Sequence, residues 1–273
     1  MSDLNPAANG RARIAAAFAQ AQQTQSAALM PYFTLGYPDR QTSLDVVAAI
    51  APDSDLLELG VPFSDPLADG PTIQHSTQVA LENGTTVRGC LEMLAELRQR
   101  GVETPIMLMG YYNPILAYGV KNYVRDAAAA GADGFIVPDL PPEEAGELEE
   151  AAARTGTALI HFLAPTSSPA RIANVAERAQ GFIYLVSLTG VTGARTAVQS
   201  DLAAFVARVR QQASVPLAVG FGISTPQQAA QIGGMADGVI VGSALINAVD
   251  QAAGDKPGAA AAFVQTLREG VSG

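Results

Sequence analysis

The sequence predicts an α/β protein of the (β/α)8 TIM-barrel class. Eight short apolar segments alternate with segments of helical spacing along 273 residues, a length close to that of one such barrel. The apolar segments are nearly continuous, which is typical of parallel strands buried on both faces. A similarity between two segments of the chain supports a closed barrel. Ala132–Val137 (ADGFIV) resembles Ala236–Val241 (ADGVIV), which places strands four and eight in equivalent positions of the two half-barrels.

Turn-forming residues mark the ends of the expected strands. The first apolar run stops at Gly36-Tyr37-Pro38 and the second at Gly60, because glycine and proline interrupt extended structure. In chain order, we expect strands at Ala28–Leu35, Asp55–Gly60, Pro105–Met109, Gly134–Val137, Ala158–Leu163, Phe182–Val186, Pro216–Val219 and Gly238–Val241.

Helical spacing of apolar residues fills the intervals. Pro71 suits the first position of a helix, Gly101 and Gly131 suit helix ends, and the glutamates after Pro142 suit the positive end of a helix dipole. We expect helices at Arg11–Gln20, Thr42–Ile50, Pro71–Glu82, Thr86–Arg100, Gly119–Ala130, Glu143–Arg154, Pro169–Arg178, Leu202–Gln212, Pro226–Ile232, Ala244–Val249 and Ala259–Leu267. Extra short helices thus occur at the N-terminus, after strand two and after strand eight. No polar linker divides residues 1–273, so we expect one barrel domain.

Composition excludes several classes of protein. The net charge of −10 argues against nucleic acid or an anionic membrane as a partner. No apolar run approaches the roughly 18 to 20 residues of a membrane span, and the N-terminal stretch lacks the apolar region of a secretory signal. We therefore expect a cytoplasmic protein. Cys90 is the only cysteine, which excludes a disulfide framework.

Histidine and lysine are scarce. His75 and His161 are the only histidines, so zinc hydrolysis and Ser-His-Asp chemistry are poorly supported, and we expect no metal site. Lys121 and Lys256 are the only lysines, and neither lies in a core strand where a Schiff-base lysine would be expected.

The candidate catalytic groups are carboxylates. Glu58 lies within an apolar strand, where an ionised group is costly to desolvate, and Asp65 and Asp69 follow on a proline-rich loop. One carboxylate in an apolar setting and one in a polar setting suit proton transfer and charge stabilisation, respectively. The alternative is that Glu58 is a buried carboxylate held by a backbone amide and that the aspartates merely form turns.

Three glycine-bearing loops follow the last strands. They are Thr189–Gly193, Gly220–Ser224 and Gly242–Leu245, at the strand ends where barrel enzymes often bind phosphate. Glycine allows backbone N–H groups to approach an anion, and Ser243 begins a short helix whose N-terminus favours one. Each loop alone is an ordinary turn, whereas the three together predict a phosphate site.

The residues resemble the tryptophan synthase alpha subunit family. The resemblance covers nearly the whole chain, and its most specific part is Leu57–Thr72 (LELGVPFSDPLADGPT), which contains Glu58 and Asp69. Further matching segments are Pro31–Pro38, Gly110–Pro114, Thr189–Arg195 and Gly220–Ser224.

This resemblance implies a lyase of tryptophan biosynthesis that cleaves indole-3-glycerol phosphate to indole and glyceraldehyde 3-phosphate by a retro-aldol reaction. Glu58 would be the general acid and base, Asp69 would stabilise the indole N1–H, and Tyr184 would be a further catalytic residue near Glu58. The substrate-binding residues would be Tyr32, Ile73, Tyr111, Thr192 and Phe221, and the phosphate-binding residues would be Gly193, Gly222, Ile223, Gly242 and Ser243.

The family also implies a partner. Indole would pass to a pyridoxal-phosphate-dependent beta subunit in an alpha2beta2 heterotetramer, so this chain itself would need no cofactor. We expect the docking rim at Leu67 and Tyr112–Ile115, in the loops after strands two and three.

Several residues have a second interpretation. The three tyrosines could be core or rim residues, Arg195 could steer phosphate or be a solvated charge, His75 is expected on a helix surface, and His161 is expected to have no family role. The chain could also be another phosphate-handling barrel enzyme, a silent docking subunit or a lyase without a partner.

Overall fold

The computed structural model describes residues 9–186, 195–220 and 222–272, and these form a closed barrel of eight strands. Every neighbouring strand pair is parallel, and β8 pairs with β1 to close the ring. The strands are β1 (Ala28–Thr34), β2 (Leu57–Gly60), β3 (Ile106–Met109), β4 (Gly134–Ile136), β5 (Ala158–Leu163), β6 (Ile183–Val186), β7 (Leu217–Gly220) and β8 (Gly238–Val241). The expected TIM barrel is confirmed.

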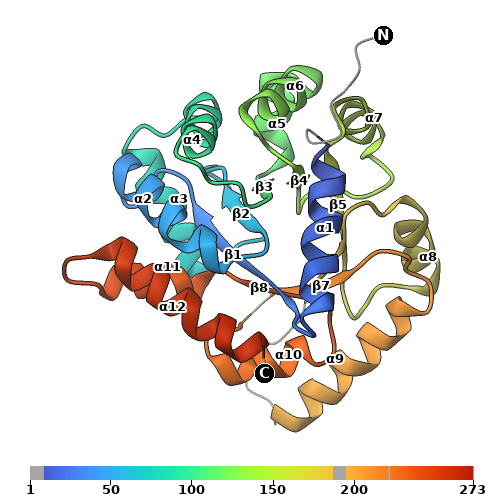
Figure 1. Cartoon of the computed structure of the whole chain (residues 1–273). Coiled ribbons are helices and arrows are strands. Elements are labelled where there is room, and N and C mark those ends of the chain that lie inside the picture. The colour runs from blue at the N-terminus through green and yellow to red at the C-terminus, as the bar shows by residue number, and fades with distance from the viewer. Residues whose placement is uncertain (1–8, 187–194, 221, 273) are drawn as a thin grey trace.

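Helices surround the barrel (Figure 1). They are α1 (Gly10–Gln23), α2 (Arg40–Ile50), α3 (Pro71–Glu82), α4 (Val87–Gln99), α5 (Tyr112–Tyr118), α6 (Val120–Ala130), α7 (Gly146–Thr155), α8 (Pro169–Arg178), α9 (Arg195–Arg210), α10 (Pro226–Gly233), α11 (Ser243–Gln251) and α12 (Lys256–Val271). A short 3-10 turn, η2 (Ala51–Asp53), precedes β2. The extra helices at the N-terminus, after β2 and after β8 are all present as expected.

Helix α5 was not expected, because Tyr112–Ile115 was assigned to a loop. Pro114 lies in the first turn of α5, where the missing N–H removes no intrahelical bond. The carboxylate of Asp139 accepts the Tyr112 N–H at 3.0 and 3.2 Å and so holds the start of the helix. The signal for α5 therefore comes from a residue 27 positions away in the chain.

Three other helices begin three or more residues away from their expected starts. Helix α12 begins at Lys256 rather than Ala259, because the Asp255 carboxylate caps it by accepting the Gly258 N–H. Helix α7 begins at Gly146 rather than Glu143, because the prolines at 141 and 142 lead into turns in which Ala145 N–H bonds the Pro142 carbonyl. Helix α9 begins at Arg195 rather than Leu202, and residues 195–201 contain no glycine or proline that would stop it.

Strand register separates an interior layer from an outer layer. Tyr32 pairs with Glu58 and Thr34 with Gly60, so these four residues share the inner face, whereas Phe33 and Leu59 pack outward against the helices. The interior cluster includes Met30, Met107, Ile136, Ile160, Phe182 and Ile240, and Ile14 and Phe18 of α1 pack into it.

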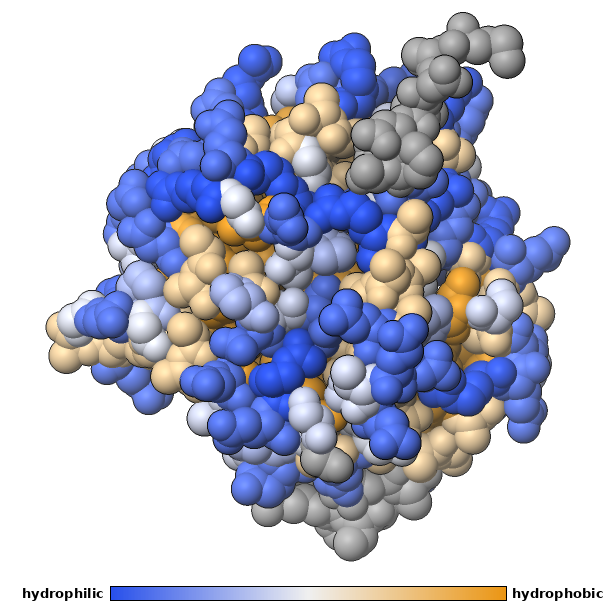
Figure 2. Space-filling view, in the orientation of Figure 1, coloured by the Kyte–Doolittle hydropathy of each residue, from blue (hydrophilic) through white to orange (hydrophobic). Residues whose placement is uncertain are grey.

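Helix α1 thus covers the barrel at the amino ends of the strands. The same face, seen in Figure 2, carries mainly hydrophilic side chains with smaller apolar areas between them. Among the residues that the structure describes, no helix has the length and apolar character needed to cross a membrane.

Three aspartates at this end of the barrel tie neighbouring strands together. Asp55, Asp133 and Asp237 stand before β2, β4 and β8, and each accepts a backbone N–H at or near the start of the preceding strand, at 2.7 to 2.8 Å. Each also pairs with arginine, as in Asp55–Arg268, Asp133–Arg98, Asp133–Arg13 and Asp237–Arg210. The sequence similarity between strands four and eight therefore includes an aspartate with the same structural role, since Asp133 and Asp237 each bind the preceding strand.

Candidate active site

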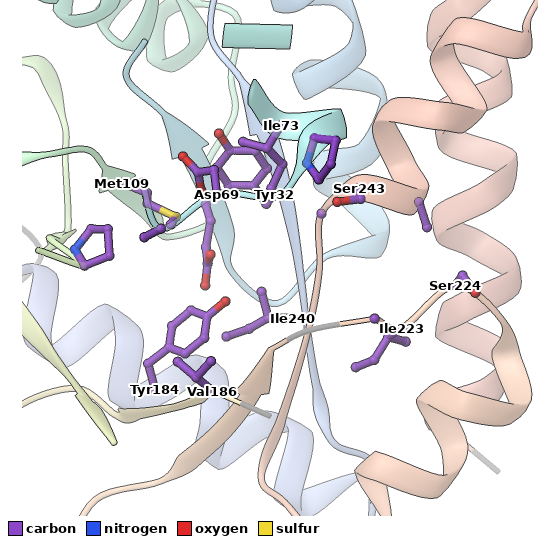
Figure 3. A pocket seen from close by; sticks show the side chains of 18 of the residues that line it. Tyr32, Asp69, Ile73, Met109, Tyr184, Val186, Ile223, Ser224, Ile240 and Ser243 are labelled. Atoms are coloured by element: carbon purple, nitrogen blue, oxygen red, sulfur yellow. The ribbon is translucent and has the colours of Figure 1, made fainter. Parts of the chain in front are cut away.

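A cavity of about 500 Å³ opens at the carboxyl ends of the strands. Figure 3 shows it from close by, with Asp69 and Tyr32 on one side, Tyr184 projecting into it from another, and Ser243, Ser224 and Ile223 at the far end. The described residues that line it are Tyr32, Glu58, Ala68, Asp69, Gly70, Pro71, Ile73, Met109, Pro138, Phe162, Tyr184, Val186, Gly222, Ile223, Ser224, Ile240, Gly242, Ser243, Ala244 and Asn247.

Glu58 is fully buried in this cavity. It lies on β2 between Tyr32 of β1 and Met107 of β3 in strand register, and its exposed fraction is 0%. Neither carboxylate oxygen has a hydrogen-bond partner among the described residues, so the alternative of a carboxylate held by a backbone amide is wrong for this part of the chain. Burial raises the pKa of Glu58 to about 8. The group can therefore gain and lose a proton near neutral pH.

Asp69 occupies a more polar setting. Tyr111 donates its hydroxyl proton to Asp69 Oδ2 at 2.9 Å, and Ala68 N–H donates to the Tyr111 oxygen at 2.9 Å. Burial raises the pKa of Asp69 to about 6, and the hydrogen bond from Tyr111 opposes that rise. The two carboxylates of the cavity therefore differ in hydrogen bonding and in pKa, as the sequence pattern predicted.

Asp65, the third carboxylate of the segment, is exposed and does not line the cavity. Its carboxylate accepts the Ser64 hydroxyl at 2.6 Å, and its carbonyl accepts the Leu67 N–H. It has the turn-forming geometry that was the alternative for both loop aspartates.

Two tyrosine hydroxyls occupy space that glycine leaves free. A Cβ atom at Gly60 would lie 2.0 Å from Tyr32 Oη, and one at Gly220 would lie 2.2 Å from Tyr184 Oη. Tyr184 also packs on Phe162, with ring centroids 4.7 Å apart. Burial raises the pKa of Tyr184 well above its ordinary value, and the charge of Glu58 raises it further, so the two groups lie in one electrostatic environment.

The other expected substrate-binding residues have different positions. Ile73, in the first turn of α3, lines the cavity. Tyr111 is not among the described lining residues, and its contribution to the site is its contact with Asp69 and its packing on Phe63 at 5.5 Å. Thr192 and Phe221 lie outside the described residues.

Small residues and a helix N-terminus form the far end of the cavity. Gly222 adopts a φ of 72°, which glycine tolerates without strain, and Ile223 and Ser224 follow it. Gly242 caps α11 and Ser243 begins that helix, so the positive end of its dipole faces the cavity. The described lining contains no lysine or arginine. Gly193, the remaining residue of the expected phosphate site, lies outside the described residues, and the Arg195 side chain is also undescribed.

The two histidines lie away from the cavity. His75 is exposed on α3, and its ring contacts Tyr37 with centroids 6.3 Å apart, as expected for a helix surface residue. His161 is buried on β5 and bonds Glu149 of α7 at 3.0 Å, outside the barrel interior. In the described part of the chain, no group of three histidine, cysteine, aspartate or glutamate side chains could hold a metal.

Several lining residues were missed by sequence reasoning. Those near the carboxyl ends of strands point inward, and they are Met109, Pro138, Phe162, Val186 and Ile240. Ser224 comes from the loop after β7, and Asn247 comes from helix α11. Strand parity counted from Glu58 could have found the residues on strands, because alternate residues of each strand face the interior.

The chain has the fold and the site of a TIM-barrel enzyme. Its cavity lies at the carboxyl ends of the strands, where the active sites of such enzymes lie, and it contains two carboxylates that differ in burial and hydrogen bonding. The sequence pattern of the tryptophan synthase alpha chain family matches residues 18–271. The chain belongs to the tryptophan synthase alpha chain family, and it is an enzyme subunit of a lyase complex in tryptophan biosynthesis.

Individual relatives agree with this assignment. The tryptophan synthase alpha chain of Roseiflexus castenholzii is 52% identical over 94% of this chain and 99% of its own length. That of Chloroflexus aggregans is 50% identical over 93% of this chain and 96% of its own. The crystal structure of tryptophan synthase subunit alpha from Legionella pneumophila superposes with a TM-score of 0.88 at 37% identity, covering 95% of this chain and 98% of that one.

Proposed function

We propose that this chain cleaves indole-3-glycerol phosphate to indole and glyceraldehyde 3-phosphate, with Glu58 as the general acid and base. The observation that carries the proposal is the state of Glu58, which is buried, without a hydrogen-bond partner among the described residues, and poised near neutral pH inside a substrate-sized cavity. A carboxylate in that state can give a proton to one substrate atom and take one from another.

The chemistry needs an electron sink, and the substrate supplies it. Protonation of indole C3 by Glu58 makes the ring able to accept the electron pair of the carbon–carbon bond. As that bond breaks, the glycerol hydroxyl loses its proton to Glu58 and becomes the aldehyde. Asp69, held by Tyr111 at 2.9 Å, would accept the indole N1–H and stabilise the positive charge that develops on the ring. Tyr184 would complete the wall beside Glu58.

The remaining lining residues would hold the two ends of the substrate. Tyr32 and Ile73, which line the cavity, would contact the indole ring. The resemblance to the family adds Phe221 to this contact. The amides of Gly222, Ile223, Gly242 and Ser243, with Gly193, would bind the phosphate, which suits a cavity whose described lining has no basic side chain. Thr192 would close over the site.

We also propose a beta subunit as the partner, in an alpha2beta2 assembly, with pyridoxal phosphate carried by that subunit and none in this chain. A docking surface for this partner is supported by two large apolar side chains that are exposed in the described part of the chain. Leu67, on the Asp65–Asp69 loop, is 93% exposed, and Leu116, on α5, is 55% exposed. Indole is neutral and escapes readily into solution, so direct transfer to a docked partner would prevent its loss. The same assignment carries the expectation of a cytoplasmic location.

The test is indole release from indole-3-glycerol phosphate by wild type and by Glu58→Gln, each alone and with a beta subunit. We expect turnover that rises with the partner and falls by at least about 100-fold in Glu58→Gln, because general acid–base catalysis contributes that much. Glu92→Gln, an exposed position on α4, is the matched control and should behave as wild type. Absence of indole from wild type under both conditions would contradict the proposed reaction, and turnover unaffected by the partner would contradict the assembly.

A further inference from the structure

The loop that carries Asp69 is exposed over most of residues 64–68. Two of its backbone hydrogen bonds are internal to the loop. The Leu67 N–H donates to the Asp65 carbonyl at 2.9 Å, and the Asp69 N–H donates to the Pro66 carbonyl at 3.0 Å. The position of Asp69 relative to the cavity therefore depends on residues outside the loop.

Among the residues that the structure describes, two from outside the loop donate hydrogen bonds to Asp69. Tyr111 donates its hydroxyl to the Asp69 carboxylate at 2.9 Å. Gln74, in the second turn of α3, donates its side-chain Nε2–H to the Asp69 carbonyl oxygen at 2.8 Å. Tyr111 thus holds the end of the Asp69 side chain, and Gln74 holds the backbone from which that side chain projects.

The bond from Gln74 does not cap helix α3. The first N–H groups of a helix lack partners and need acceptors, whereas Gln74 supplies a donor to a carbonyl that precedes the helix. Gln74 is exposed and is not among the described residues that line the cavity. Neither capping of α3 nor contact with the substrate therefore accounts for this bond, and its effect falls on Asp69.

A hydrogen bond to the Asp69 carbonyl restrains the direction of the Asp69 side chain. The peptide unit is planar, so a fixed carbonyl oxygen limits rotation about the Cα–C bond of Asp69. We propose that Gln74 is a positioning residue for the reaction proposed above: it fixes the Asp69 backbone so that the carboxylate, held at its other end by Tyr111, stays at the cavity. The inference rests on the proposed function, because Asp69 acts on the indole N1–H in that reaction.

The test is indole release from indole-3-glycerol phosphate at saturating beta subunit, with kcat and KM measured separately. Gln74→Met removes the side-chain N–H and keeps an unbranched side chain of similar helix propensity. We expect kcat to fall about tenfold, because a small misplacement of a catalytic group has an effect of that order. KM should change less than about twofold, because Gln74 is not among the described lining residues. Gln74→Glu has the same shape without the N–H and should lower kcat at least as much if Gln74→Met does not fold.

Gln78→Met is the matched control. Gln78 is exposed one turn further along α3, and its side chain donates to Glu82 Oε1 at 2.8 Å. The substitution therefore removes a similar hydrogen bond from the same helix without touching Asp69. Its kcat should stay within about twofold of wild type, as for most surface substitutions.

A double variant shows whether Gln74 acts through Asp69. Asp69→Asn lacks the carboxylate that Gln74 positions, so adding Gln74→Met should lower the residual rate less than about twofold. Two independent effects would multiply, and the loss caused by Gln74→Met would then keep its full size in the double variant.

Four results would overturn the inference. A kcat of Gln74→Met equal to that of an active wild type would show that the bond does not matter, and an equal loss in Gln78→Met would assign the effect to α3 in general. A loss confined to KM would place Gln74 in substrate binding. An undiminished loss in the Asp69→Asn background would show that Gln74 acts elsewhere. No indole from wild type would instead remove the proposed function, and this inference with it.

Discussion

The burial of Glu58, for which we propose a catalytic role, has a cost in stability. Its pKa is raised from the ordinary 4.5 to about 8 by burial, so the folded chain keeps a proton on this group over a pH range in which the unfolded chain has lost it. The folded state binds more protons in that range, and the free energy of unfolding therefore falls as the pH rises from 4.5 to 8. Above pH 8 both states are ionised and the loss is complete.

Glu58→Gln should therefore stabilise the protein at neutral pH while it lowers the activity at least about 100-fold. Glutamine has a similar shape and carries no charge, so its burial has no dependence on pH. We expect the variant to exceed wild type by about 3 kcal/mol at pH 7 and by little or nothing near pH 4.5, since each unit of pKa shift corresponds to about 1.4 kcal/mol. Urea unfolding of both proteins at several pH values measures the difference, and a difference that does not grow with pH would contradict the explanation.

Residues without charge also determine the geometry of the site. Gly60 and Gly220 lack the Cβ atoms that would collide with the hydroxyls of Tyr32 and Tyr184. The sequence presents these glycines as a strand end and as part of a phosphate loop. Each glycine also leaves room for the phenol of the strand paired with its own: Gly60 on β2 for Tyr32 on β1, and Gly220 on β7 for Tyr184 on β6. This second role exists only when those strands are paired.

At the scale of elements, the aspartates before β2, β4 and β8 connect neighbouring strands. Each accepts a backbone N–H from the preceding strand, namely that of Leu29, Ile106 or Leu217. The environments differ around the ring. Asp133 is 3% exposed and bonds the Ile106 N–H, Arg98 and Arg13, whereas Asp237 is 36% exposed. Arg98 also donates to the carbonyls of Val102, Thr104 and Gly131, so several loops depend on one buried ion pair.

This difference predicts unequal effects of the same substitution. Asp133→Ala leaves two arginines without their carboxylate, and we expect a loss of about 3 to 5 kcal/mol of unfolding free energy, as for other broken buried pairs. Asp237→Ala loses one backbone hydrogen bond and a solvent-exposed pair, and we expect a loss of about 1 to 2 kcal/mol. Denaturant unfolding at pH 7 compares the two, and equal losses would show that burial of the pair is not the deciding factor.

At the scale of the whole molecule, the exposed apolar residues lie on the side that carries the loops after β2 and β3. Leu116→Glu should weaken binding of a beta subunit about tenfold, because it introduces a charge into an apolar contact, and it should leave the basal rate of this chain unchanged. Ala170→Glu, an exposed position on α8, adds the same charge elsewhere and is the control. Titration of the partner by calorimetry measures both, and equal affinities would place the docking surface elsewhere.

Much of this architecture was predictable from the chain alone. The order of elements, the barrel class and the segment that holds Glu58 and Asp69 follow from apolar periodicity, from turn residues and from one specific motif. These signals are local, so a linear sequence contains them in full. Helix α5 escaped prediction because its first N–H groups are satisfied by Asp139, which follows a different strand.

The sequence by itself determined which fold this protein has, which family it belongs to and which carboxylates face its cavity. Only the tertiary structure decided the pKa values and the hydrogen bonds of these carboxylates. The raised pKa of Glu58 results from burial by residues on several strands, and the hydroxyl that donates a hydrogen bond to Asp69 belongs to Tyr111, which lies 42 residues further along the chain. Desolvation and hydrogen bonding are properties of a complete three-dimensional environment, which forms only when the barrel closes.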